Sequence, residues 1–140
     1  MAENCKRQDI DSIAALTLTP ETELPTITAE NYPALLDAFS AGPAIAQAAA
    51  EANGVVWEDH TIDGPGGSID VTVLKPAQLL GNSPLYLAIH SGGTIIGDRF
   101  GAINGGYDEY SWIKEHNMII VTPEYRLAPD HPAPAGLDDC

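Results

Sequence analysis

Two segments in the middle of the chain alternate between apolar and polar residues. Val55–Ile62 alternates loosely and Ile69–Leu74 alternates strictly, and alternation with a period of two is typical of half-buried β-strands. Between them lies Asp63–Gly67, a stretch rich in glycine that predicts a turn. The two segments are therefore expected to form a β-hairpin.

Two later runs, Leu85–Ile89 and Met118–Val121, are short and almost purely apolar. Such runs predict strands that are buried on both faces, as in a parallel sheet. Between them Tyr107–His116 predicts a helix, and Asn117 suits its C-cap. The order strand, helix, strand predicts a βαβ crossover, so the hairpin is expected to lead into a mixed sheet.

The N-terminal third has a different pattern. Residues 1–28 are polar, with recurrent Thr and Pro, and predict an irregular lead-in. Residues 29–54 carry apolar residues at helical spacing, and Thr28 is a candidate N-cap. Gly42–Pro43 is expected to break this segment into two helices, and Asn53–Gly54 to end the second. At the other end of the chain, Ala135–Cys140 predicts the opening turn of a helix.

Composition narrows the class of protein. Hydrophobic residues make up 44% of the 140 residues, which is typical of a globular domain. Six basic against twenty acidic residues give a net charge of −14, which argues against nucleic acid and anionic membranes as partners. The two cysteines, Cys5 and Cys140, make no disulfide framework, and the N-terminus lacks the apolar segment of a signal peptide. We therefore expect a cytoplasmic protein without a membrane span; the oligomeric state stays open.

The first candidate for chemistry is the loop His90–Gly93, of sequence His-Ser-Gly-Gly, directly after the first apolar run. Glycines let a backbone approach a ligand closely, and acyl-transfer enzymes need backbone N–H donors where an oxyanion forms. An HGGG-type motif after a strand is such a donor in lipases and esterases. Taken alone, this short motif favours a plain glycine turn.

The segment Glu124–Ala135 makes the interpretation specific. It contains Tyr-Arg-Leu-Ala-Pro and resembles the YRLAPE-x-P-x-PA segment of hormone-sensitive-lipase-like esterases, which follows the HGGG loop at about this separation. Asp63–Ile69 and Lys75–Pro76 also resemble the family's first hairpin. The resemblance covers residues 29–140. It implies an α/β fold, the three-layer sandwich of an α/β-hydrolase, of which the chain holds the N-terminal portion: a cap-like helical segment over 29–54 and a truncated core over 55–140.

The resemblance also implies roles for the glycine loop. Gly92 and Gly93 match the glycines whose N–H groups contribute to the oxyanion hole, and His90 matches a residue that supports the loop. Ser91 stands where the family mostly has its first glycine, so a positive φ at this position would cost about 1–2 kcal/mol. The family needs no cofactor or metal, and its substrates would be small esters of short- to medium-chain acids.

None of Ser40, Ser68 and Ser111 lies in a G-x-S-x-G turn between a strand and a helix, where this fold carries its nucleophile. The resemblance places the catalytic Ser, Asp or Glu, and His in that order beyond Cys140. The 140 residues alone are thus expected to be inactive. Two alternatives stay open: a non-catalytic small-molecule receptor of the same fold, and a truncated product without function.

The remaining polar residues favour structural roles. Arg126 is expected to be a fork that binds Glu124 or Asp130. The histidines His60, His116 and His131 have no metal-like spacing with other residues, and we expect them at the surface or in loops.

Overall fold

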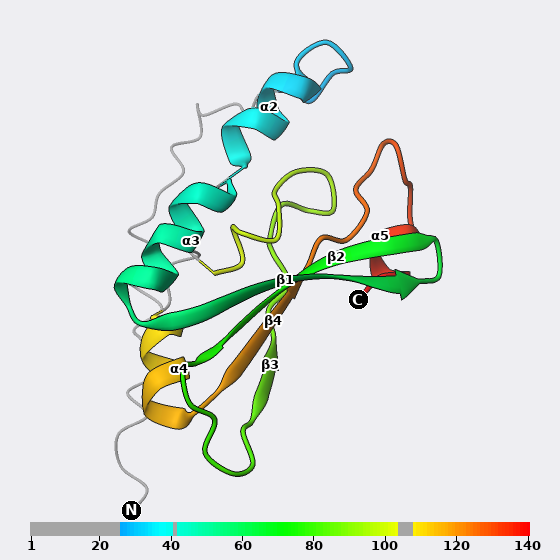
Figure 1. Cartoon of the computed structure of the whole chain (residues 1–140). Coiled ribbons are helices and arrows are strands. Elements are labelled where there is room, and N and C mark those ends of the chain that lie inside the picture. The colour runs from blue at the N-terminus through cyan, green and yellow to red at the C-terminus, as the bar shows by residue number, and fades with distance from the viewer. Residues whose placement is uncertain (1–25, 41, 104–107) are drawn as a thin grey trace, which may run out of the picture.

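The computed structural model describes residues 26–40, 42–103 and 108–140. In this part of the chain four strands form one mixed sheet in the order β1-β2-β4-β3, with α3 and α4 beside it (Figure 1). Most of the predicted lead-in lies outside the described residues. The boundaries of the lead-in, the cap-like segment and the core stay predictions.

The predicted hairpin is confirmed. Strand β1 (Val55–Gly64) pairs antiparallel with β2 (Gly67–Pro76) over its whole length, from Val55 opposite Pro76 to Gly64 opposite Gly67. The turn predicted from the glycine-rich stretch is short, because the strands extend into it from both sides. The hairpin forms the green ribbon that runs across Figure 1.

The βαβ crossover is also confirmed. Strand β3 (Leu85–Leu87) lies parallel to β4 (Ile119–Pro123), and α4 (Glu109–His116) connects them. Strand β4 in turn pairs antiparallel with β2, which joins the hairpin to the parallel pair.

The prediction that the first apolar strand is buried on both faces is wrong for this structure. Strand β3 is an edge strand, and Leu85, Tyr86 and Leu87 are 65%, 41% and 41% exposed. In the predicted run only Ala88 is buried, whereas Ile89 is 52% exposed. Apolar composition does not reveal pairing order, and a strand that pairs on one side only keeps an open edge.

The helical segment breaks where predicted, between α2 (Tyr32–Phe39) and α3 (Pro43–Ala52). Thr28 is not the N-cap, however, because Asn31 precedes α2. Instead, the Asn31 backbone N–H donates to Thr28 Oγ1 at 3.3 Å, and the Thr28 N–H donates to Asn31 Oδ1 at 2.7 Å. These two bonds form the turn that leads into the helix.

Helix α4 begins later than predicted because Asp108 is its N-cap, accepting from the Ser111 backbone N–H at 3.2 Å. Asn117 ends the helix with a left-handed φ of 52°, as predicted. The short helix α5 (Ala135–Asp138) forms within the predicted opening turn.

One apolar core joins α3 and α4 to the sheet. Its buried members come from α3, the four strands or their ends, the loop after β3, and α4: Ala50, Val55, Leu74, Ala88, Ile103, Ile113 and Ile120. This arrangement, with helices packed on a mixed sheet, confirms the predicted α/β-hydrolase class for the portion described.

Candidate active site: the glycine loop after β3

The loop after β3 turns sharply at its two glycines. Gly92 has a φ of 123° and Gly93 a φ of 63°, both in the region that disfavours side chains. The Gly92 carbonyl accepts from the N–H groups of Ile95 at 3.1 Å and Ile96 at 3.2 Å, which closes the turn. A Cβ atom at Gly92 would lie 1.8 Å from the Ile96 carbonyl oxygen, so this position requires glycine for space as well as for conformation.

The turn leaves donors free. Within residues 26–40, 42–103 and 108–140, the N–H groups of Gly92 and Gly93 donate to no protein acceptor. Two successive N–H groups in such a turn form a concavity that suits an anion. This geometry supports an oxyanion role, which stays a prediction for both glycines.

Ser91 causes no strain in place of the family's first glycine. Positive φ angles outside glycine occur, among the described residues, only at Thr94 and Asn117, so the anticipated cost at Ser91 is absent. Thr94 takes the strained conformation instead, with a φ of 62°, and its Oγ1 donates to the Gly93 carbonyl at 2.6 Å.

His90 is buried beneath the loop and contacts it directly. Its Nδ1 lies 2.8 Å from the Ser91 carbonyl oxygen, and because a carbonyl only accepts, Nδ1 carries the proton. The ring stacks on Tyr125 with centroids 4.1 Å apart, and the Tyr125 hydroxyl donates to the His90 carbonyl at 2.8 Å. Tyr125 belongs to the Tyr-Arg-Leu-Ala-Pro segment, so the two motifs of the sequence meet at this stack. The contacts are those of a loop support, the role that the resemblance implies.

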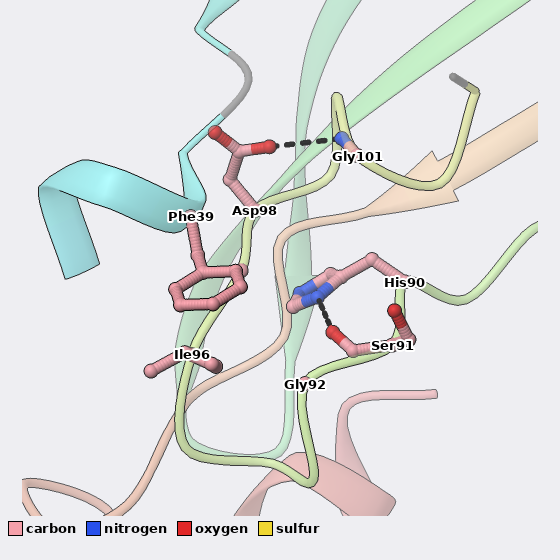
Figure 2. Close-up of a pocket in the computed structure, with 8 residues that line it drawn as sticks. Phe39, His90, Ser91, Gly92, Ile96, Asp98 and Gly101 are labelled. Atoms are coloured by element: carbon pink, nitrogen blue, oxygen red, sulfur yellow. Dashed lines mark hydrogen bonds between the residues drawn. The ribbon is translucent and has the colours of Figure 1, made fainter. Parts of the chain in front are cut away.

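A pocket of about 150 Å³ lies against the loop, between Phe39 at the end of α2 and His90, Ser91, Gly92 and Ile96 (Figure 2). A more open pocket of about 390 Å³ lies beside Tyr32, Ile95 and Pro129. The Tyr32 hydroxyl donates across it to the Ala128 carbonyl at 2.9 Å. The glycine loop is therefore flanked by two pockets, each with one wall from the helical segment; Asp98 also lines the smaller one.

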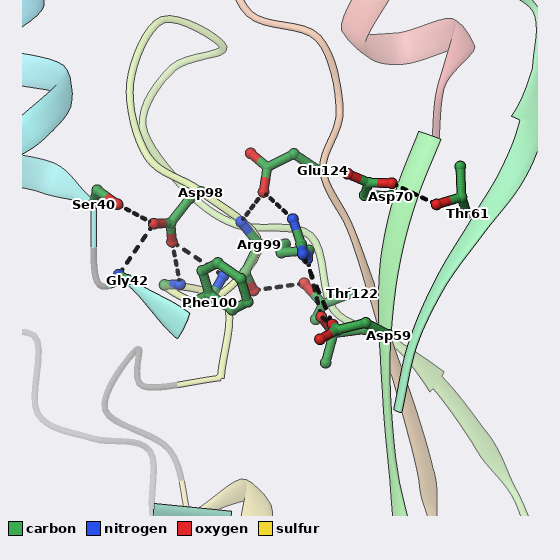
Figure 3. A network of polar contacts seen from close by, with 12 residues as sticks. Ser40, Gly42, Asp59, Thr61, Asp70, Asp98, Arg99, Phe100, Thr122 and Glu124 are labelled. Carbon is green, nitrogen blue, oxygen red and sulfur yellow. Dashed lines mark hydrogen bonds and ion pairs between the residues drawn. The ribbon is translucent and has the colours of Figure 1, made fainter. Parts of the chain in front are cut away.

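Asp98 is a functional candidate that the sequence interpretation missed. It is 8% exposed, and its carboxylate accepts from the backbone N–H groups of Phe100 at 3.0 Å and Gly101 at 2.9 Å. It also accepts from the Ser40 hydroxyl at 2.5 Å and the Gly42 N–H at 3.3 Å (Figure 3). Burial alone would raise the pKa of Asp98, but these hydrogen bonds outweigh it and lower the pKa below its ordinary value.

The signal for Asp98 was a local one. In a common type of turn, the side chain of an aspartate accepts hydrogen bonds from the backbone N–H groups two and three residues later. Asp98 accepts in this way from Phe100 and Gly101, and the glycine at position 101 was the sequence signal for such a turn.

Arg126 is a fork, as predicted, but both predicted partners are wrong. Its Nε and Nη2 each lie 2.8 Å from one oxygen of Asp139, and its backbone N–H donates to the same carboxylate at 2.9 Å. Hydrogen bonds from Arg126 hold the pKa of Asp139 below its usual range. Glu124 pairs with Arg99 instead, 3.2 Å from Nη1. The turn into α5 brings Asp139 back to Arg126, whereas Asp130 lies exposed.

Two buried polar atoms have no partner in the part of the chain that the structure describes: His90 Nε2 and Glu109 Oε2. Glu109 is the first residue of α4 and is 2% exposed, and burial raises the pKa of its carboxyl. Both residues line a pocket of about 160 Å³ beneath the loop.

The other histidines show no sign of chemistry. His60, His116 and His131 are exposed, and His60 lies 3.4 Å from Glu58. A search of the described residues finds no cluster of His, Cys, Asp or Glu able to hold a metal ion. None of the helices described has the length and apolarity to cross a bilayer.

Comparisons with known proteins agree with the predicted fold. Residues 86–140 match the profile of a family described as alpha/beta hydrolase fold. Over 83 residues the chain is 34% identical to esterase LipI of Mycobacterium tuberculosis. This match covers 58% of the present chain and 25% of LipI. The chain thus spans a quarter or less of the length of the curated relatives it matches.

Solved structures extend the agreement over most of the described chain. A bacterial heroin esterase superposes with a TM-score of 0.58 at 25% identity, over 94% of this chain and 40% of that one. An esterase from the archaeon Pyrobaculum calidifontis superposes with a TM-score of 0.54 at 22% identity, over 93% and 38%, and shows the fold alone.

The chain is therefore an α/β-hydrolase-fold protein. Within that fold its two motifs resemble those of the hormone-sensitive-lipase-like family, and the match to the alpha/beta hydrolase fold profile covers residues 86–140.

Proposed function

We propose that the chain provides the oxyanion-binding loop of a carboxylic-ester hydrolase. Gly92 and Gly93 would donate their N–H groups to the tetrahedral intermediate, while His90 and Ser91 hold the loop in shape. The nucleophilic serine, its acid and its histidine would lie beyond Cys140. No cofactor would take part, the substrates would be small esters of short- to medium-chain acids, and we place the reaction in the cytoplasm.

The observation that carries this proposal is the pair of N–H groups at Gly92 and Gly93, in the loop after β3, which have no acceptor among the described residues. Donors that are already fixed in place stabilise a developing oxyanion without reorganisation, and in many enzymes this is the largest contribution to catalysis. The sharp turn at Gly92 and Gly93 fixes them, and the stack of His90 on Tyr125 supports the turn from below.

The test is Gly93→Val in a hydrolase that contains this segment. A β-branched side chain tolerates a φ of 63° poorly, so the loop has to shift and the Gly93 N–H turns away. We expect kcat to fall by about 10²–10³, the usual loss on removing one oxyanion donor. A folded variant with unchanged kcat would contradict the role of Gly93.

The 140 residues by themselves should show no ester turnover, because two donors without an activated serine cannot form an acyl-enzyme. The control is a serine-reactive phosphonate on a short-chain aryl ester: phosphonate-sensitive turnover by this chain would refute the placement of the nucleophile. The receptor alternative is distinguished by the coding sequence after Cys140, where a nucleophile turn without a later histidine would favour binding over catalysis.

A further inference from the structure

Asp98 joins two parts of the molecule that are far apart in sequence. Among the described residues, one carboxylate oxygen, Oδ1, accepts from its own loop, at the N–H groups of Phe100 and Gly101. The other, Oδ2, accepts from the junction between α2 and α3, at the Ser40 hydroxyl and the Gly42 N–H (Figure 3). A single buried side chain therefore links the helical segment to the loop that carries the glycines.

Helix α2 itself lies at the surface of the described part of the chain. None of its residues is buried, and the hydrogen bond from the Tyr32 hydroxyl to the Ala128 carbonyl ties its first turn. Its last residue, Phe39, is 57% exposed and contributes a wall of the 150 Å³ pocket. Because Ser40 directly follows Phe39, the bond from Ser40 to Asp98 fixes the end of α2 that carries this wall.

We propose that Asp98 is a positioning residue that holds Phe39 over the glycine loop, and that Phe39 sets the size of the group accepted beside Gly92. A cavity of about 150 Å³ is the size that accommodates benzene. The pocket therefore has room for a short acyl chain or a phenyl ring. The part of this inference that concerns acyl groups rests on the proposed function; the link between Asp98 and α2 does not.

The first experiment compares hydrogen–deuterium exchange of the full chain with that of Asp98→Asn. An amide nitrogen at position 98 would face N–H donors whichever oxygen it replaced, so either the bond from Gly42 or the bonds from Phe100 and Gly101 are lost, and the bond from Ser40 loses its charged acceptor. We expect the amides of Tyr32–Phe39 to exchange roughly ten- to a hundredfold faster, since one or two hydrogen bonds to a charged group are lost.

Two further variants keep this test decisive. Ser40→Ala removes only the bond next to α2 and keeps the bond from Gly42; it should speed exchange in α2 while the Phe100 and Gly101 amides stay protected. Asp108→Asn removes another hydrogen-bonded carboxylate, at the start of α4, and should leave α2 unchanged. Exchange in α2 that is equally fast in the wild type, Asp98→Asn and Ser40→Ala would overturn the proposed link.

The second experiment measures specificity in a hydrolase that contains this segment. Phe39→Ala and Asp98→Asn should both raise kcat/KM for a long-chain aryl ester relative to the acetate, by about tenfold, whereas Gly93→Val should lower kcat for both esters alike. An unchanged ratio in Phe39→Ala would refute the specificity role. If no ester were hydrolysed at all, the proposed function would fail, and the exchange experiment would still decide the link.

Discussion

The two glycines of the loop should differ sharply in what a methyl group does to them. An alanine Cβ at position 92 would lie 1.8 Å from the Ile96 carbonyl oxygen and 2.7 Å from its carbon, both of them backbone atoms. At position 93 the same methyl group would meet nothing within 4 Å. Gly93→Ala is therefore the matched control for Gly92→Ala, one residue away and with the same added atom.

The magnitudes follow from conformation and space. At Gly93, a φ of 63° lies in the left-handed region and costs an alanine about 1–2 kcal/mol. At Gly92, a φ of 123° is sparsely populated by any side chain and costs about 1–3 kcal/mol. Moving the Ile96 carbonyl aside adds about 1–3 kcal/mol, as overpacking does elsewhere. We expect Gly92→Ala to lose about 2–6 kcal/mol in total.

Urea unfolding of the full chain, followed by tryptophan fluorescence, measures this difference. Trp57 stacks on Phe100 with ring centroids 5.8 Å apart, so its emission reports on the end of the same loop. The expected result is a clearly lower midpoint for Gly92→Ala than for Gly93→Ala at an unchanged slope. Equal midpoints would refute the tight turn at Gly92, and with it the geometry that frees the two N–H groups.

Two further predictions concern buried acids and pH. Asp139→Asn should destabilise the chain at pH 7, measured as the urea midpoint. Because the pKa of Asp139 is lowered in the folded state, the stability difference between wild type and variant should persist above pH 3.8, the ordinary pKa of the group, and shrink as the pH falls below it towards pH 3. Glu109→Gln should behave in the opposite way. Because burial raises the pKa of Glu109, the wild type loses stability as the pH rises above 4.5, the ordinary pKa of the group. The variant should therefore be more stable than the wild type at pH 7 and equally stable near pH 3. A variant no more stable than the wild type at pH 7 would mean that Glu109 has a partner.

Local patterns predicted the parts of the fold that local forces decide. The alternation in β1 and β2, the break at Gly42–Pro43 and the left-handed cap at Asn117 each depend on a few adjacent residues. Exposure of β3 depends instead on which strand lies beside it, and a run of apolar residues carries no information on that order. The partner of Arg126 likewise depends on how the chain turns into α5.

The site shows the same division between local and distant causes. The glycine loop was predicted from its own residues, whereas the link between Asp98 and Ser40 joins positions that no periodicity relates. In a sequence, a buried carboxylate cannot be distinguished from a surface one. The environment of a buried carboxylate depends on hydrogen-bond donors that lie far away in the sequence.

Asp98 and Glu109 show that hydrogen-bond donors affect the charge state of a buried acid. Both are buried acids at the edges of the same loop region, 8% and 2% exposed. Asp98 accepts from donors on both sides, and its pKa is lowered although it is buried; Glu109 Oε2 has no donor among the described residues, and its pKa is raised. Desolvation opposes ionisation in both; the hydrogen bonds outweigh it at Asp98, whereas at Glu109 desolvation prevails and the neighbouring charge of Asp108 adds to it. A carboxylate kept charged by four donors is suited to hold two segments together, which is why the link to α2 is argued from Asp98 and not from Glu109.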